Sequence, residues 1–176
     1  ELLAQYREGL IATSACLAGG VAQFLLEEDY NAAKEYALRM ADIFGPEHFY
    51  LEMQDHGIEE QIAVNQGVQR LARETGLPLI VTNDAHYLRK EDAAMQDVLL
   101  CIQTGKTVDE PNRMKFETEE FYLKSEEELR QLFPGCDEAF ENTVKIADRC
   151  NLEFTFHEYH LPSFPVPEGY TNEGYF

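Results

Sequence analysis

The chain has few basic residues and no long apolar segment. Its 14 lysines and arginines face 33 acidic residues, which gives a formal net charge of −19. Such a surface repels the phosphate backbone of nucleic acids, so contact with DNA requires a local metal site or attached domains. No apolar run reaches the roughly 18 residues of a membrane span, and no charged and then apolar leader opens the chain. We therefore expect a soluble, cytoplasmic protein that makes no contact with membranes.

The chain also lacks paired cysteine motifs. Its four cysteines lie far apart and form no Cys-x-x-Cys, which argues against a zinc knuckle and against a secreted fold held by disulfides. We expect reduced thiols, most of them buried. With 176 residues, 44% of them hydrophobic, the chain has the size of a single domain and can bury a core.

Strand patterns and helix patterns alternate over the first half of the chain. Short apolar stretches predict strands at residues 9–13, 49–53 and 79–81, the first followed by small residues that allow a tight turn. Apolar residues at helical spacing predict helices at about 31–44 and 59–75, the second burying Ile62, Val68, Leu71 and Ala72. This order predicts an α/β fold with parallel strands and crossover helices, either an open sheet or part of a barrel.

The second half is predicted to be mainly helical. A helix at about 92–103 is expected to turn Val98, Leu99 and Ile102 inward, and residues 121–123 form a short strand. Ser125 and Glu128 make a capping box that opens a helix reaching Phe133, and a further helix runs from 137 to about 150. Prolines and glycines then break the pattern, so the last 25 residues are expected to form an extended arm (Pro162, Pro165, Pro167, Gly169 and Gly174).

Asp84 and His86 follow the apolar run that ends at Val81, where a buried strand passes into a loop. Loops at strand ends often carry the chemistry of α/β proteins. Two residues apart on an extended backbone, a carboxylate and an imidazole point to the same side and can bind one divalent cation. Two other roles remain open: His86 can hydrogen-bond a strand-end carbonyl, and Asp84 can cap the helix that follows.

Three further residues are candidates near the expected strand ends. Cys16 lies in the turn after the first strand and is either a ligand or a buried thiol. Glu52 is interpreted as a polar residue at the outer end of its strand. His56 is interpreted as a turn residue, with a place on the rim of the site as the alternative.

Four segments occur in an order that is similar to a known family, namely residues 9–19, 49–57, 82–88 and 99–105. They resemble the later part of the amino-terminal PHP (polymerase and histidinol phosphatase) domain of bacterial DNA polymerase III alpha subunits, the replicative C-family polymerases. Segments 121–125, 142–151 and 159–165 extend the resemblance over nearly the whole chain. It implies a C-terminal PHP portion at 1–125, a closing helical segment at 126–151, and a linker at 152–176 toward a polymerase palm, which is absent here.

The resemblance implies a distorted (β/α)7 barrel whose strand ends hold a cluster of divalent metals, Zn²⁺ or Mn²⁺, with Mg²⁺ or iron as alternatives. Such sites hydrolyse phosphoesters and can act as 3′→5′ exonucleases. Cys16 matches the family's late cysteine ligand, and Asp84 and His86 match its closing Asp-x-His pair. The family's early His-x-His is missing from this sequence. We therefore expect neither nuclease nor nucleotidyltransferase (DNA polymerase) activity from this chain alone.

Two other functions stay open. The region can be a non-catalytic docking module for the proofreading exonuclease subunit, or a complete small phosphoesterase, although its other histidines show no ligand spacing. The resemblance implies as partners DNA, the remaining domains of the alpha subunit, the exonuclease subunit and the sliding clamp. An incomplete barrel leaves strand edges unpaired, so we also expect the chain to self-associate.

Overall fold

The computed structural model describes residues 1–175 and contains a parallel sheet of three short strands, β1 (Ala12–Thr13), β2 (Phe49–Met53) and β3 (Leu79–Val81). The strand order is β1-β2-β3, so β2 lies in the centre. Ala12 pairs with Phe49 and Leu51 pairs with Leu79, which brings the carboxyl ends of all three strands to one edge. The predicted α/β fold with parallel strands is confirmed.

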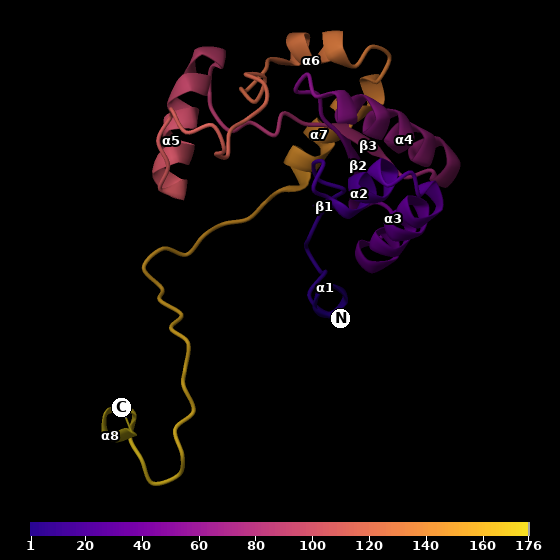
Figure 1. Cartoon of the computed structure of the whole chain (residues 1–176). Coiled ribbons are helices and arrows are strands. Elements are labelled where there is room, and N and C mark those ends of the chain that lie inside the picture. The colour runs from indigo at the N-terminus through magenta and orange to yellow at the C-terminus, as the bar shows by residue number, and fades with distance from the viewer. Residues whose placement is uncertain (176) are drawn as a thin grey trace.

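Helices connect and cover the strands (Figure 1). Two of them, α3 and α4, are the crossover helices that parallel pairing requires. The helices are α1 (Leu2–Gln5), α2 (Gly20–Leu26), α3 (Tyr30–Phe44), α4 (Glu59–Thr75), α5 (Ala93–Thr104), α6 (Glu126–Leu132), α7 (Asp137–Arg149) and α8 (Asn172–Tyr175), with a 3₁₀ turn η1 (Lys90–Asp92) before α5.

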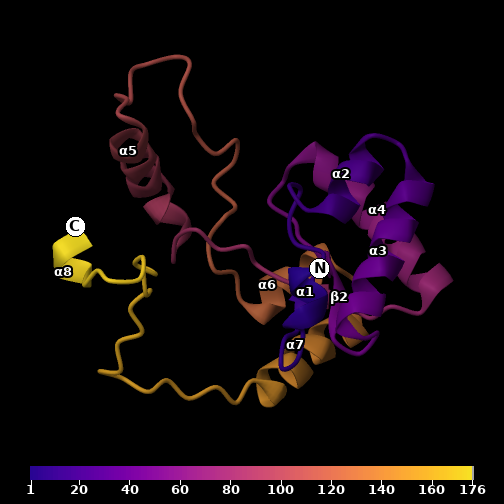
Figure 2. The same cartoon turned by 90° about the horizontal axis from the view of Figure 1, so that it is seen from below.

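The two faces of β2 have different neighbours. Phe49, Leu51 and Met53 alternate along one face, and all three are fully buried in the core to which α3 and α4 contribute. The opposite face carries Tyr50, whose hydroxyl accepts a hydrogen bond from Arg149 at the end of α7 at 3.0 Å. Seen in two directions, α7 lies on one side of the sheet and α2, α3 and α4 lie together on the other (Figures 1 and 2).

Local sequence signals account for the limits of the crossover helices. Asp29 caps α3, because its carboxylate accepts a hydrogen bond from the Ala32 amide at 2.9 Å. Gly76 ends α4 in the left-handed conformation, with φ of 73°. Within α4, a side chain at Gly67 would lie 2.7 Å from the side chain of Leu25, so this glycine allows α2 to pack closely on α4.

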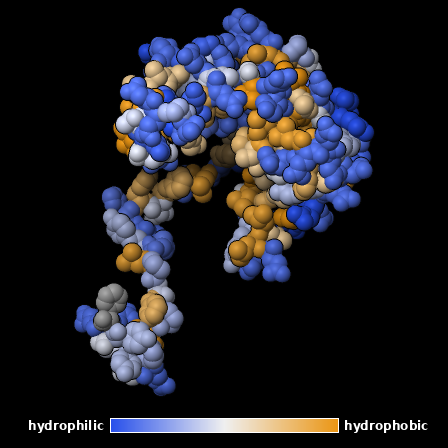
Figure 3. All heavy atoms as spheres, viewed as in Figure 1, coloured by the Kyte–Doolittle hydropathy of each residue, from blue (hydrophilic) through white to orange (hydrophobic). Residues whose placement is uncertain are grey.

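The expected inward face of the helix at 92–103 is wrong. Val98, Leu99 and Ile102 are 46%, 52% and 72% exposed, and α5 lies apart from the sheet in both views (Figures 1 and 2). Apolar surface is visible on this part of the molecule (Figure 3). Another side of α5 buries Leu100 and Cys101, and Arg113 of the following segment binds the carboxylate of Asp97 with two nitrogens at 2.5 and 2.6 Å. The helical periodicity correctly indicated an apolar face on α5, but the rest of residues 1–175 leaves this face exposed.

Smaller differences concern single elements. Residues 121–123 form no strand, only one bridge between Tyr122 and Tyr87, and the first strand is two residues long. The helices α1 and α2 were not predicted. Ile62 is exposed instead of buried, because it lies on the outer side of α4 while Val68 and Leu71 face the core. All four cysteines are free, as expected, but only Cys101 is buried.

The C-terminal part of the chain leaves the body and ends in α8 (Figure 1). Residues 152–171 contain no helix or strand and are exposed almost throughout. The conformation is the extended one expected, whereas the role of this segment as a linker stays a prediction. Within residues 1–175, no helix combines the length and the apolar character needed to cross a bilayer.

Two substitutions distinguish a core position from the exposed face of α5. Leu71→Ala should lower the free energy of unfolding by about 2–5 kcal/mol, because it leaves a cavity under the sheet. Ile102→Ala should change it by no more than about 0.5 kcal/mol, because the side chain is already in water. Urea unfolding followed by circular dichroism measures both, and equal losses would show that α5 packs through this face.

Candidate functional site at the strand ends

Polar side chains gather where the three parallel strands end. Thr13 and Ser14 stand at the end of β1, Glu52 and Gln54 at the end of β2, and Thr82 directly after β3. We call these five residues the strand-end network. Backbone bonds align the ends, because the Ser14 amide donates to Tyr50 and the Thr82 amide donates to Met53, at 2.9 and 3.1 Å.

Glu52 is the acceptor at the centre of the strand-end network. One carboxylate oxygen accepts from the Thr13 hydroxyl at 2.5 Å. The other accepts from the Thr82 hydroxyl and from the Gln54 side-chain amide, the latter at 2.8 Å. The Glu52 backbone amide donates to the Ser14 hydroxyl at 2.8 Å. This residue therefore bonds to the ends of both neighbouring strands, a role that its interpretation as an outer polar residue missed.

Cys16 lies in the turn between β1 and α2, beside the strand-end network. It is half-buried and lines a small cavity of about 10 Å³ together with Glu52, Gln54 and Asn65. Gln54 is almost fully buried, and its side-chain oxygen has no hydrogen-bond partner among residues 1–175. Cys16 thus lies near the end of β2.

Asp84 and His86 lie in the loop after β3. Asp84 has a φ of 44°, so the backbone at this residue is left-handed and not the extended one that the sequence argument assumed. Nδ1 of His86 lies 2.8 Å from the Asp84 carbonyl oxygen and must donate to it, because a carbonyl can only accept. Nε2 is then the nitrogen left for a ligand, an arrangement common for histidines that bind metals.

Aromatic rings hold the imidazole of His86 in place. Its edge meets Phe116 and Phe121, with centroid distances of 4.8 and 5.5 Å, although the residue as a whole is exposed. The contact with the carbonyl is the one that the hydrogen-bonding role predicts, and it is compatible with the ligand role because it leaves Nε2 unused.

His56 lies in a bend after β2, as its interpretation as a turn residue requires, and it is also part of the core. It is 1% exposed and stacks on Phe121 at a centroid distance of 4.1 Å. Nε2 donates to the Asn83 carbonyl at 2.7 Å, and Nδ1 accepts from the Gln61 amide at 2.8 Å. Because both ring nitrogens are used within the protein, His56 has none left for a metal ion.

Asn83 fixes the loop that carries Asp84 and His86. Its side chain accepts from the Lys124 amide at 3.0 Å and donates to the Lys124 carbonyl at 3.1 Å. The Lys124 side chain is itself buried, which lowers the pKa of its ammonium group, and its nitrogen contacts Glu120. The hydrogen bond from Lys90, together with the charges of Lys90 and Lys124, keeps the pKa of Glu120 below its usual value, and burial opposes this shift.

The three predicted ligands have suitable chemistry, since thiolate, carboxylate and imidazole all bind Zn²⁺ and related ions. Among residues 1–175, however, no three side chains of His, Cys, Asp or Glu lie close enough to hold an ion together. The described chain alone therefore does not fit a metal cluster. Ligation by Cys16, Asp84 and His86 stays a prediction that needs further donors.

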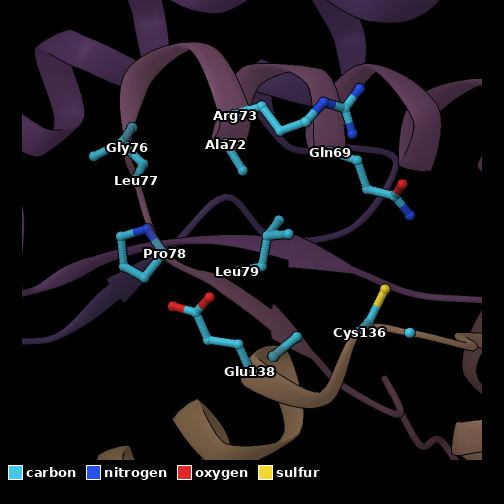
Figure 4. Close-up of a pocket in the computed structure, with 11 residues that line it drawn as sticks. Gln69, Ala72, Arg73, Gly76, Leu77, Pro78, Leu79, Cys136 and Glu138 are labelled. Carbon is cyan, nitrogen blue, oxygen red and sulfur yellow. The ribbon is translucent and has the colours of Figure 1, made fainter.

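A larger cavity, of about 420 Å³, lies away from the strand ends (Figure 4). It is lined by the end of α4, the residues that lead into β3 and the start of α7, with Gln69 and Leu79 facing Cys136 and Glu138. Burial, and to a lesser degree the charge of Asp137, raise the pKa of the Cys136 thiol. This cavity is at the amino end of β3, opposite the edge where the predicted ligands lie.

Substituting Asn83 tests whether it holds the loop after β3. Asn83→Ala should destabilise the chain by about 1–2 kcal/mol, because it leaves the Lys124 amide and carbonyl without their partner. Asn151→Ala is the control, since that exposed side chain makes only one long bond of 3.4 Å, and its effect should stay within about 0.5 kcal/mol. Thermal unfolding compares the two, and equal effects would remove the assignment.

Comparison with known proteins gives the family. The PHP domain family matches residues 1–56. Proteins named DNA polymerase III subunit alpha are 44% identical over 176 residues in Treponema pallidum (strain Nichols), 43% over 173 in Borreliella burgdorferi, and 42% over 181 in Thermus aquaticus. These alignments cover 100%, 98% and 99% of this chain but 15% of each relative.

The PHP match is consistent with a (β/α) barrel fragment, as the parallel sheet with its crossover helices also indicates. The identity extends over both the sheet and the helical segments that follow it. The chain therefore belongs to the DNA polymerase III alpha subunit family, as a segment that spans about 15% of the length of the relatives it matches.

Proposed function

We propose that the chain acts as part of a DNA-directed DNA polymerase in DNA replication, and that its PHP region belongs to a metal-dependent phosphoesterase site. The observation that carries this proposal is 42–44% identity to polymerase III alpha subunits over 98–100% of the chain. Polymerase activity would reside in the longer subunit, because this segment corresponds to about 15% of its relatives.

Within that site, Cys16, Asp84 and His86 supply three ligands, and the remaining donors come from outside residues 1–175. Clustered divalent ions activate water and neutralise charge on phosphoryl oxygens. This chain's own contribution is to present the three side chains from the loops after β1 and β3, which lie on either side of the end of β2. The free Nε2 of His86 and the position of Cys16 beside the strand-end network support this assignment.

The charge of the chain is compatible with such a role only within a larger protein. A formal charge of −19 repels DNA, so the substrate must be drawn in by metal ions and by other domains of the subunit. On this proposal, DNA, the remaining domains, the sliding clamp and the proofreading exonuclease subunit are partners of the full-length protein in the cytoplasm. The isolated segment has no nuclease activity.

Asp84→Asn in the full-length subunit tests the ligand assignment. We expect bound Zn²⁺ or Mn²⁺ and 3′→5′ exonuclease activity to fall, activity by at least on the order of 100-fold, because an amide is a weaker ligand than a carboxylate. Polymerase activity on a primed template should be unchanged. Metal analysis and the two activity assays measure this.

Asp109→Asn is the matched control, since Asp109 is an exposed aspartate in the segment after α5. It should leave metal content and both activities as they are. If Asp84→Asn behaves like the control in a subunit that degrades DNA, Asp84 is not a ligand. Nuclease activity of the isolated 176-residue chain would contradict the proposal that other donors are needed.

A docking role is the second candidate. Within residues 1–175, no three side chains are placed to hold a metal ion, which favours this role. The polar groups at the strand ends also have partners within the chain, since the hydroxyls of Thr13 and Thr82 both donate to Glu52. In this case the full-length subunit carries no metal at the site and has no nuclease activity. It would then bind the proofreading exonuclease subunit through this region, and deleting the region would abolish co-purification of the two proteins.

A further inference from the structure

We infer that Glu52 is a positioning residue, which ties the loop of Cys16 to the loop of Asp84 and His86. The inference rests on the proposed function only where it concerns metal binding. The physical tie itself is independent of that function, since it follows from the hydrogen bonds of the strand-end network.

Glu52 stands on the central strand and bonds outward in both directions. Toward β1 its carboxylate accepts from Thr13 at 2.5 Å and its amide donates to Ser14 at 2.8 Å. Toward β3 the other carboxylate oxygen accepts from Thr82. Ser14 is two residues before Cys16, and Thr82 is two residues before Asp84. One carboxylate thus lies between the starts of both loops.

Few other contacts align the ends of the three strands, because the strands are short and form few backbone hydrogen bonds. The pairing of β1 with β2 covers two residue pairs, and that of β2 with β3 covers three. A side-chain bond to each neighbour therefore adds substantially to the backbone bonds that align the ends. Hydrogen bonds to a charged acceptor are also stronger than those between neutral groups.

The environment of the carboxylate favours bonds over solvation. Glu52 is half-buried, and its neighbour Gln54 is 6% exposed. The side-chain amide of Gln54 donates to Glu52 at 2.8 Å and to Thr82 at 3.3 Å. The backbone carbonyl of Gln54 accepts from the Asn65 side chain on α4 at 2.8 Å. The network is thereby also anchored to a crossover helix, and a movement at one strand end is resisted by the others.

Two variants of Glu52 separate its hydrogen bonds from its charge. Glu52→Ala removes every side-chain acceptor. Glu52→Gln keeps one oxygen for Thr82 and Gln54, and its new amide can donate to the Thr13 hydroxyl. Glu74→Gln is the matched control, because Glu74 binds Lys34 and Arg70 on the outer side of α3 and α4.

The test is hydrogen exchange by mass spectrometry on the full-length subunit, together with the rate of alkylation of Cys16. In Glu52→Ala, amides of residues 12–17 and 80–86 should exchange faster together, on the order of tenfold, and Cys16 should be alkylated faster. Glu52→Gln should restore most of the protection. Glu74→Gln should leave both loops unchanged.

Acceleration in one loop only, or in neither, would overturn the inference. If Glu52→Ala fails to fold, two isosteric variants replace it. Thr13→Val should speed exchange in residues 80–86, and Thr82→Val should speed exchange in residues 12–17, because each cuts the tie on the opposite side. Effects confined to the substituted strand would show that the loops are independent.

Titration with Mn²⁺ alone distinguishes this inference from the proposed function. Glu52→Ala should weaken Mn²⁺ binding on the order of tenfold, and Glu52→Gln should restore it. If Asp84→Asn leaves Mn²⁺ binding unchanged while the exchange results hold, the metal assignment fails and the tie stands. If Asp84→Asn abolishes binding but Glu52→Ala does not affect it, the positioning role fails and the metal assignment stands.

Discussion

The parallel pairing of β2 with a strand on each side is the constraint on which the rest of the fold depends. It requires two crossover helices, α3 and α4, and it brings three carboxyl ends to a single edge. The face of β2 that carries Phe49, Leu51 and Met53 is fully buried, so the strand is fixed from that side by packing. Its carboxyl end is fixed by polar contacts through Glu52. Packing therefore fixes one face of β2, and hydrogen bonds fix its carboxyl end.

The sequence predicted the elements well where the apolar residues of a segment are the ones that the core buries. The apolar runs that became β2 and β3, and the helical spacing that became α4, gave the observed bounds, because the pattern of side chains and the core agree there. It failed at α5, where Val98, Leu99 and Ile102 are equally periodic but exposed. Periodicity shows that a helix has an apolar side. It does not show which part of a protein covers that side.

The place of the candidate ligands in the fold was predictable, but not their geometry. A strand followed by Asp84-Ala85-His86 predicted that both side chains follow the end of β3, as the structure shows. Their relative direction depended on an extended backbone, and the positive φ of Asp84 removes that premise. The contacts of Glu52 and His56 were not predicted, for a related reason. Their roles depend on partners from distant segments, such as Thr82 for Glu52 and Phe121 for His56, which no local pattern reveals.

The acidic composition and the candidate site are consistent because net charge and metal ligation act over different distances. Net charge acts over a Debye length, about 8–10 Å in physiological salt, and governs encounter with DNA, whereas a ligand set acts at contact distance. A segment of charge −19 can therefore hold part of a phosphoester site only if cations at that site, or basic surfaces elsewhere in the subunit, reverse the local sign. At the strand ends, the hydroxyl and amide groups bond to the carboxylate of Glu52, and the proposed ligands Cys16, Asp84 and His86 stand apart from these bonds in the two loops.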